Sequence, residues 1–430
     1  MKKLFVLLAV LALLTSCAPV TPQVVEVTRV VVETKVVEGA SVEVTRVVQE
    51  QVTKEVVVTA TPEPVVKKEA APVLGALPRS ETFIAGILTG HLGTPSNFNE
   101  WVGWKSRDRG MQNLANEPLW SVDFATGEIV NALASGDPIY NDDFTEVTIP
   151  LRQGVAWDDG EPFSSADVVY TIETLMAHKE FNNSNYFVDN VTSVTAPDDH
   201  TVLFKLKQAN SRFHTQFLDR WGCTWIMPKH VFEKQADPVT FEFNPFVGTG
   251  AYKLHSFDPN GYWTIWEKRA DWDKTAMAEW GEPAPKYVIY RSIPNNDKRL
   301  IEMVNGDLDM IHDLSPEGMF ALANQDPTAR GWFPGFPYAH PDPTLPMVIF
   351  NTQNPMFQDS RVRWALTLML DPVEMSMASY RGAATLSAIA MPPTGTHTDD
   401  YHGPLQDWLI DYALDTGKQT IKPYDATVGQ

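Results

Sequence analysis

Cysteine is nearly absent from this 430-residue chain, which contains two, Cys17 and Cys223. Two cysteines exclude a disulfide framework, and a cysteine-based metal site would need other ligands. We expect Cys223 to be a small buried thiol rather than a nucleophile. Basic residues are also scarce, because 34 Lys and Arg face 54 Asp and Glu and give a formal net charge of −20. Phosphate binding requires concentrated positive charge, so we expect no nucleic-acid partner.

Aromatic side chains are missing from the early part of the chain. No Phe, Tyr or Trp occurs between Val6 and Thr82, whereas all 13 Trp lie between Trp101 and Trp408. Residues 18–79 are rich in Val, Glu, Thr and Lys and contain EVTRVV twice, so they lack the large side chains that offset the entropy cost of ordering a chain. We predict a disordered tether there, with a coiled coil as the alternative.

The first residues form a leader pattern. A short basic start precedes an apolar run over residues 4–14, which is too short to span a bilayer and has the length of a signal-peptide core. The letters LTSC at residues 14–17 then resemble a bacterial lipobox. We predict a lipoprotein signal peptide over residues 1–17, lipid modification of Cys17, and export to the outer face of the cell membrane. An ordinary secretory signal is the alternative.

Motifs of the common catalytic and nucleotide-binding sites are absent. The chain has no GxSxG, HExxH, Walker A or GxGxxG pattern. One cluster of possible metal ligands, HTDDYH at residues 397–402, follows two prolines and is more typical of a polar loop. Neighbouring acids such as Asp142 and Asp143 diverge rather than flank a bond. We expect no enzyme activity, no cofactor and no metal.

Residues 80–430 carry mixed strand and helix signals. Alternation predicts strands in which Val147, Ile149 and Leu151 share one face, and likewise Val202, Phe204 and Leu206. Between them, Ser164 with Asp167 three residues later predicts a capped helix. The apolar stripe of that helix is Val168, Val169, Ile172, Leu175 and Met176. Later, Asp359 precedes a helix for which we expect a core face at Val362, Leu366, Met369 and Leu370, and Asp371-Pro372 begins another. Such mixing indicates an α/β or α+β fold.

Three stretches resemble the family 5 extracellular solute-binding proteins, the oligopeptide- and dipeptide-binding group of ABC importers. They are LRQGVAWDDGEPFSSADVVYTIE at residues 151–173, NPFVGTGAYKL at 244–254 and NPMFQDSRVRWALTLMLD at 354–371. In the second stretch, Phe246 is an additional residue and Ala251 stands where proline is usual. The resemblance runs from about Glu81 to the end. The residues alone read as scaffold, with a capped helix after an Asp-Gly turn and a close glycine turn.

The resemblance implies a two-lobed periplasmic-binding-protein-like fold. Its first lobe, expected over residues 80–295, is large and discontinuous, and the second is expected over residues 296–430. Members of the family normally continue well past the point that KPYDATVGQ reaches, so we expect the second lobe to be incomplete and the sequence truncated at its C-terminus.

The implied function is solute capture in an interlobe cleft by hinge closure, followed by delivery to ABC permease subunits with their ATPase. Peptide is the first expected cargo and oligosaccharide the alternative, because pyranose rings stack on indole. A surface receptor for sensing or adhesion without transport is a further alternative. We expect a monomer that meets the membrane through its lipid anchor.

The resemblance also indicates where a ligand is held. The loop TPSNFNEWVGWK occupies a position where relatives contact ligand, and it sets an acid beside two indoles. Asp399 lies near the position where some peptide-binding relatives place an acid against the peptide amine. The predicted ligand-binding residues are Glu100, Trp101, Trp104, Trp221, Trp225, Tyr338, His340 and Asp399. For each Trp, a place in the core is the alternative.

Overall fold

A computed structural model describes most of the chain. The described residues are 27–37, 40–50, 77–87, 90–103, 109–123, 126, 128–219, 222–312, 314–331, 347–383 and 398–422. Cys17 lies outside them. Residues 1–68 and 69–430 form two separate units. In the part of the chain that the structure describes, no helix has the length and apolar character needed to cross a membrane.

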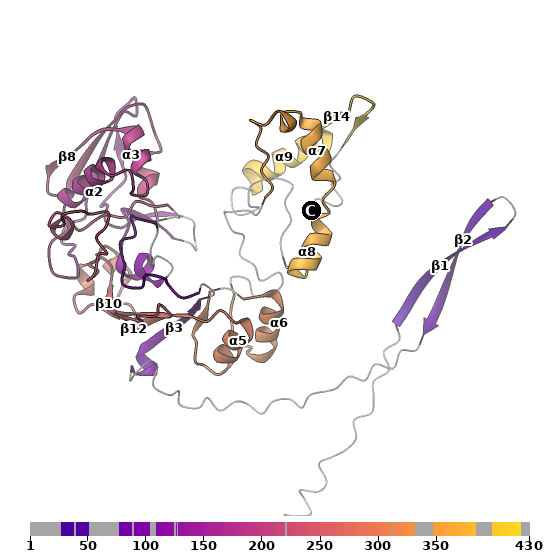
Figure 1. The fold of residues 1–430 in the computed structure, drawn as a ribbon, viewed down its shortest axis with the longest axis horizontal. Coiled ribbons are helices and arrows are strands. Elements are labelled where there is room, and N and C mark those ends of the chain that lie inside the picture. The colour runs from indigo at the N-terminus through magenta and orange to yellow at the C-terminus, as the bar shows by residue number, and fades with distance from the viewer. Residues whose placement is uncertain are drawn as a thin grey trace, which may run out of the picture. The chain divides into compact units, whose positions relative to one another are not determined.

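The first unit contains an antiparallel hairpin of β1, Val27–Val37, and β2, Ala40–Glu50 (Figure 1). The last three residues of the two EVTRVV copies pair with each other, with Val30 opposite Val47 and Val31 opposite Arg46. The expectation of a tether without regular structure is therefore wrong for these two segments. The physical reason is that the β-branched Val and Thr favour extended backbone. The coiled-coil alternative is wrong for them as well.

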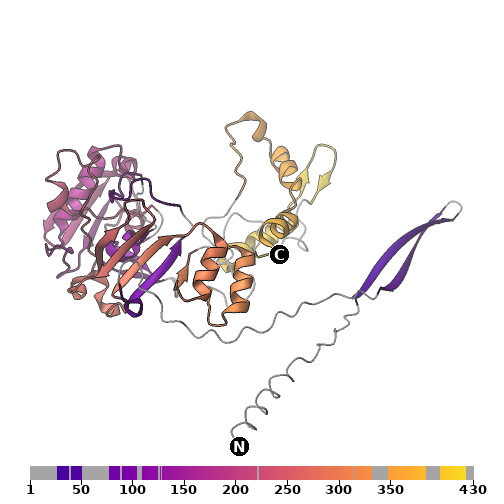
Figure 2. The same ribbon diagram turned by 60° about the horizontal axis from the view of Figure 1, so that its bottom comes forward.

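A five-stranded mixed sheet organises the start of the second unit. Its order is β10-β11-β12-β3-β13, with β3 parallel to both β12 and β13 and the other pairs antiparallel. The strands are β3, Thr82–Ile87; β10, Tyr252–Phe257; β11, Trp263–Lys268; β12, Tyr287–Ser292; and β13, Met310–Ile311. Helices α5, Asn296–Val304, and α6, Pro316–Gln325, follow at the β13 edge (Figure 2).

Both faces of this sheet are buried, as expected for strands covered on two sides. Trp266 and Val288 face the large core, while Ile84, Ile265 and Ile289 form a smaller cluster on the other face. The sheet thus joins two hydrophobic clusters of very different size.

A four-stranded antiparallel sheet with the order β6-β7-β9-β8 contributes one face to the large core. Its strands are β6, Ile139–Tyr140; β7, Glu146–Pro150; β8, Val191–Asp198; and β9, Thr201–Leu206. The predicted alternation is confirmed, because Val147, Ile149, Val202 and Phe204 are fully buried. Helix α2, Ser165–Ala177, packs on β8 and β9 and begins with the predicted capping box of Ser164 and Asp167.

Short elements connect these layers. The remaining strands here are β4, Trp120–Val122, and β5, Ile129–Asn131, and the short helices are α3, Ser184–Asn190, and α4, Lys229–Phe232. The single-turn segments are η1, Arg79–Glu81; η3, Met111–Ala115; η4, Phe213–Phe217; η5, Trp272–Lys274; and η6, Ala276–Trp280. Of these, η3 is a π-helical turn, a geometry often found at functional sites.

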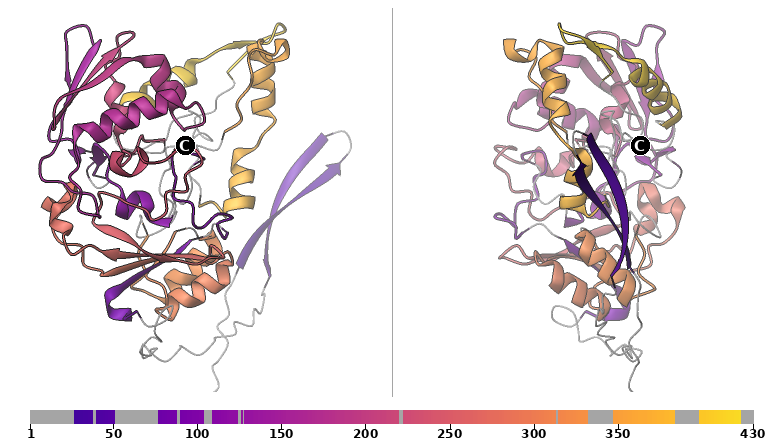
Figure 3. Two further views of the ribbon diagram at one scale, coloured as in Figure 1. Left: turned by 60° about the vertical axis from the view of Figure 1, so that its left-hand side comes forward. Right: turned by 90° about the vertical axis from the view of Figure 1, so that its right-hand side faces the viewer.

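The described residues 347–383 and 398–422 are mainly helical, and α7 and α8 follow one another along the chain (Figure 3). The elements are η7, Pro355–Phe357; α7, Ser360–Leu368; α8, Pro372–Tyr380; η8, Thr398–His402; α9, Gly403–Asp411; β14, Leu414–Asp415; and β15, Thr420–Ile421. The expected core face of α7 is wrong: Leu366, Leu370 and Met369 are 38%, 48% and 79% exposed. Within the described residues no layer covers that stripe. The predicted lobe boundary between residues 295 and 296 stays a prediction.

Candidate functional site

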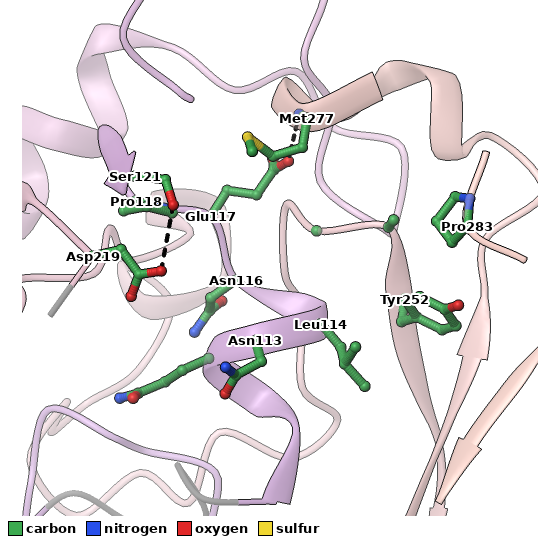
Figure 4. Close-up of a pocket in the computed structure, with 13 residues that line it drawn as sticks. Asn113, Leu114, Asn116, Glu117, Pro118, Ser121, Asp219, Tyr252, Met277 and Pro283 are labelled. Carbon is green, nitrogen blue, oxygen red and sulfur yellow. Dashed lines mark hydrogen bonds between the residues drawn. The ribbon is translucent and has the colours of Figure 1, made fainter. Parts of the chain in front are cut away.

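The candidate site is a pocket of about 250 Å³ between η3, β4, β10 and η6 (Figure 4). Its polar lining consists of Gln112, Asn113, Asn116, Glu117, Ser121 and Asp219. Its less polar lining includes Leu114, Pro118, Ala251, Tyr252, Met277 and Pro283. Several of these residues stand more than a hundred positions apart, so the pocket is a product of the tertiary fold.

Two glycines bring the walls together. A Cβ on Gly248 or Gly250 would collide with backbone oxygens of η3, and the backbone N–H of Gly250 donates to the Ala115 carbonyl at 2.8 Å. Only glycine permits this close approach of two backbones. The GTG turn therefore sets the distance between the start of β10 and η3, where it also lines the pocket at Gly250 and Ala251.

Glu117 fixes the junction between η3 and η6. Its carboxylate accepts hydrogen bonds from the backbone N–H groups of Ala276 at 3.0 Å and Met277 at 2.9 Å, the second of which is drawn in Figure 4. Burial raises the pKa of Glu117 to about 7, although these bonds and the charge of Arg269 oppose the rise. Glu117 therefore connects the segment after η3 to the start of η6, and its carboxyl group is also part of the pocket lining.

Asp219 forms a second acidic point in the lining. The Ser121 hydroxyl donates to its carboxylate at 3.4 Å (Figure 4), and the Asp219 backbone N–H donates to the Trp120 carbonyl at 2.9 Å. Burial raises the pKa of this carboxyl, while the Ser121 bond lowers it. Among the described residues that line the pocket there is no Lys, Arg or His, so none of these residues offsets the two acids.

Glu100 lies directly behind the wall and is 1% exposed. The Gln112 side-chain amide donates to its Oε2 at 2.8 Å, and the Asn116 amide donates to its Oε1. Burial raises the pKa of Glu100 to about 8, and the two amide bonds act against the rise. The predicted site residue thus touches two residues of the lining without itself being part of it.

Trp101 and Trp225 lie in the hydrophobic core, 4% and 3% exposed. The Trp101 indole N–H donates to the Trp225 carbonyl at 2.9 Å, and its ring meets Phe232 edge-on at 5.2 Å. For Trp101 and Trp225, the structure therefore shows the core position that the sequence analysis gave as the alternative to ligand contact. Their role as ligand contacts stays a prediction.

The other predicted site residues are not described. Trp104, Trp221, Tyr338 and His340 lie outside the described residues, and Asp399 belongs to η8 without a described side chain. Among the described residues, no group of three His, Cys, Asp or Glu is placed to hold a metal ion. Cys223 is buried, in agreement with expectation.

Sequence reasoning did not select Asn116, Glu117, Asp219 or Tyr252. The first two belong to the stretch NEPLW, and Tyr252 follows the glycine turn that was interpreted as pure scaffold. Asp219 carried no local signal at all, because only the tertiary fold brings it beside Ser121.

Comparisons with known proteins agree with this architecture. The bacterial extracellular solute-binding proteins, described as family 5 Middle, match residues 128–423. The oligopeptide-binding protein AppA of Bacillus subtilis is 26% identical over 295 residues, which are 66% of this chain and 50% of AppA. Protein XP55 of Streptomyces lividans is 35% identical over 185 residues, 42% of this chain and 31% of XP55. The chain thus spans half or less of the length of these two relatives.

Solved structures of similar fold include two of one Thermotoga maritima protein, a periplasmic oligopeptide-binding component of an oligopeptide ABC transporter. One has a TM-score of 0.65 at 21% identity and covers 76% of this chain and 59% of its own. The other is bound to mannohexaose and has a TM-score of 0.61 at 19% identity, covering 81% and 65%. At these identities the likeness shows the fold, which is the two-lobed fold of periplasmic solute-binding proteins.

Proposed function

The chain belongs to the bacterial extracellular solute-binding proteins of family 5, and on that premise we propose that it captures a peptide and delivers it to an ABC importer. In this role it binds solute outside the cell and passes it to permease subunits that work with an ATPase. No covalent step is needed, since affinity alone selects the cargo.

The pocket at η3 is the observation that supports this role. Its volume of about 250 Å³ suits one residue or one ring of a solute rather than a whole ligand. Its side chains come from segments that a glycine turn holds in fixed positions. A preformed polar pocket lowers the ordering cost of binding, so it serves as an anchor for part of a longer ligand.

Further parts of the proposal concern closure, anchoring and contacts. We propose a monomer whose lobes close over the solute like a hinge and whose Cys17 carries a lipid that holds it at the outer face of the membrane. We also propose that the loop residues named from the sequence extend the ligand site. These are Glu100, Trp101, Trp104, Trp221, Trp225, Tyr338, His340 and Asp399.

An oligosaccharide is the second candidate cargo. The Thermotoga maritima protein of similar fold was solved with mannohexaose bound, so this fold accommodates a sugar chain. The amide and carboxylate side chains of the pocket suit sugar hydroxyls as well as they suit a peptide amine.

Thermal unfolding of the full chain with peptide and oligosaccharide panels tests the proposal. A ligand that binds only the folded state stabilises it by about 2.7 kcal/mol at a hundredfold excess over Kd. Asn113→Trp, which inserts an indole into the pocket lining, should abolish the shift. Asn324→Trp, at an exposed position of α6, should not. An absence of shifts with both panels would contradict solute binding.

Membrane fractionation tests the anchor separately. The wild-type chain, expressed in a bacterium with lipoprotein processing, should sediment with membranes, whereas Cys17→Ser should be released into the soluble fraction. Cys223→Ser, at the buried thiol, is the matched control and should sediment like the wild type. Equal release of both variants would contradict lipid modification at Cys17.

A further inference from the structure

The hairpin of β1 and β2 is a two-stranded sheet of its own. The two strands pair along their whole length, and among the described residues neither strand pairs with a third. Residues 1–68 also form a unit separate from residues 69–430. A two-stranded hairpin alone is at best marginally stable in water, whereas three or more strands sustain a sheet. The hairpin would therefore gain stability from a further strand.

The outer edges of the hairpin can accept such a strand. In an antiparallel ladder, every second residue turns its backbone N–H and C=O toward the neighbouring strand, and the residues between turn theirs away from it. Neither β1 nor β2 contains a proline, which would remove a backbone donor. Both outer edges consequently present a row of backbone donors and acceptors to another strand.

The charged residues of β1 favour a second copy of the same strand as the partner. Arg29 and Glu33 are four positions apart, so they lie on one face of β1. When two copies of β1 pair antiparallel with Val31 opposite Val31, each Arg29 stands opposite a Glu33 of the other copy. Opposite charges directly across a ladder stabilise it, and like charges destabilise it. This register joins residues 27–35 of both copies.

Other symmetric registers of β1 combine length and charge less well. Pairing along residues 27–37 places Arg29 opposite Lys35 at both ends, which is a like-charge contact. A register that places Glu33 opposite Lys35 joins only residues 31–37 and leaves Arg29 outside the ladder. The register centred on Val31 is therefore the longer of the two with opposite charges.

The edge of β2 gives a shorter pairing with itself. Arg46 and Glu50 are four positions apart, but the register that places them opposite each other joins only residues 46–50 of β2. Glu43 and Arg46 are three positions apart and lie on opposite faces, so they cannot stand opposite each other in a symmetric pair. The outer edge of β1 is therefore the better edge for a second copy.

We propose that β1 pairs with β1 of a second copy of this chain, which joins two hairpins into a four-stranded antiparallel sheet of order β2-β1-β1-β2. Solute capture stays the task of each single copy, because the contact involves residues 27–35 and not the pocket. A contact confined to one strand is weak between freely diffusing chains. Holding both chains at one membrane surface raises their effective concentration and favours it.

Disulfide trapping of the full chain in intact bacterial cells tests the contact. Opposite residues of an antiparallel ladder have Cα atoms about 4.5–5.5 Å apart, a distance that a disulfide spans. We expect Val31→Cys to give a cross-linked dimer on a non-reducing gel after mild oxidation. Val42→Cys, on β2, is the matched control and should give at least about tenfold less dimer, because the two β2 strands would lie about 14 Å apart. The wild type sets the background from Cys17 and Cys223.

Charge reversal tests the register. Arg29→Glu or Glu33→Arg, each added to Val31→Cys, sets like charges opposite each other and should reduce the yield of dimer about tenfold. The double reversal restores opposite charges and should return the yield to within a factor of about two of Val31→Cys alone. This recovery separates pairing between copies from damage to the hairpin, which a second reversal would not repair.

Three results would overturn the inference. The first is a dimer yield from Val31→Cys no higher than that from Val42→Cys or the wild type. The second is a yield that the single reversals do not lower or that the double reversal does not restore. The third is a cross-link of Val31→Cys to a different protein in place of the dimer. Each of these results leaves the proposed solute binding untouched, because trapping needs no ligand.

Discussion

Among the described residues of 77–312, many of the largest side chains are almost completely buried, for example Trp157, Trp266 and Phe204, although Trp280 is 58% exposed. In residues 347–422 the apolar side chains of three helices are largely in contact with solvent, with Met369 79% and Trp408 56% exposed. The buried hydrophobic residues of this second region, which the structure describes at 347–383 and 398–422, are Ala383, Leu409 and Leu414.

The two regions do not differ in their local helix signals. In the first, α2 begins with the capping box of Ser164 and Asp167, and in the second, Asp359 and Asp371 cap α7 and α8. They differ in what faces the helix, because α2 lies on β8 and β9, whereas the described residues place no sheet against α7. A helix can therefore be specified locally while its burial depends on another layer.

Replacing a buried arginine should produce the largest difference between the regions. Arg269 is 2% exposed and donates to the carbonyls of Ala156, Trp157, Thr249 and Gly250 at 3.1–3.2 Å. Arg269→Met leaves these buried acceptors without a donor, so we expect a loss of roughly 3–5 kcal/mol in the free energy of unfolding. Urea unfolding followed by circular dichroism measures it.

Arg361→Met is the matched change in residues 347–422. Arg361 pairs with Asp359 at 2.6 Å, but both side chains are well exposed. Exposed ion pairs contribute little, so we expect no resolved shift of the urea midpoint. Equal losses in the free energy of unfolding for Arg269→Met and Arg361→Met would contradict the idea that burial determines how much an arginine stabilises the fold.

A pair of leucines tests the same contrast without charge. Leu175 is fully buried on α2, whereas Leu370 is 48% exposed after α7. Leu175→Ala should cost about 2–5 kcal/mol through lost burial and the cavity left behind. Leu370→Ala should stay within about 0.5 kcal/mol. Urea midpoints of the two variants measure this, and a large loss at Leu370 would mean that its stripe is covered in solution.

The same contrast explains how much of the fold the sequence predicted. Alternation located β7 and β9, and the capping pattern located α2, because both signals are local. The resemblance supplied the family and the two-lobed fold. The apolar stripe of α7 was wrongly predicted to be a core face. Periodicity shows which face of a helix is apolar but not whether another layer packs against it. The hairpin β1–β2 was missed because few large side chains were taken to mean little order.

The candidate site was predicted only in part, for a related reason. The loop holding Glu100 lies next to the pocket, but a single sequence does not say whether a residue lines a pocket or packs behind its wall; the role of Glu100 in ligand binding stays a prediction. Large indoles such as those of Trp101 and Trp225 satisfy a core as readily as a binding surface. Asp219 and Tyr252 could not be selected, because they reach the pocket only through the tertiary fold.

The pH dependence of stability should also differ between the regions. Burial raises the pKa of Glu100 to about 8 from the 4.5 of a free side chain. Its stabilising contribution is therefore complete below about pH 4.5 and is lost as the pH rises through 8. Asp359 in residues 347–422 behaves oppositely, because hydrogen bonds from Arg361 lower its pKa to about 2. Its contribution is present above about pH 3.8 and is lost as the pH falls through 2.

Glu100→Gln isolates the first of these effects. Gln stays neutral, so we expect the decline in the free energy of unfolding between pH 5 and pH 9 to become shallower by roughly 4 kcal/mol. Denaturant unfolding at several pH values measures the slope. Glu173→Gln, exposed on α2, should keep the wild-type slope, and an unchanged slope in Glu100→Gln would mean that this carboxyl does not titrate as burial predicts.

Helix caps should give the smallest effect and the finest test of the comparison. Asp167, at N3 of α2, accepts from the Ser164 backbone N–H at 2.9 Å, and Asp371 accepts from the Glu374 backbone N–H at 2.8 Å. Ser164→Ala should lower the global free energy of unfolding by about 1 kcal/mol, because α2 unfolds together with the sheet it packs on. Asp371→Ala should instead speed amide hydrogen exchange at the start of α8 and leave the urea midpoint of residues 77–312 unchanged. A midpoint shift in Asp371→Ala as large as that in Ser164→Ala would mean that both regions unfold as one cooperative unit, in which case exposure alone does not separate them.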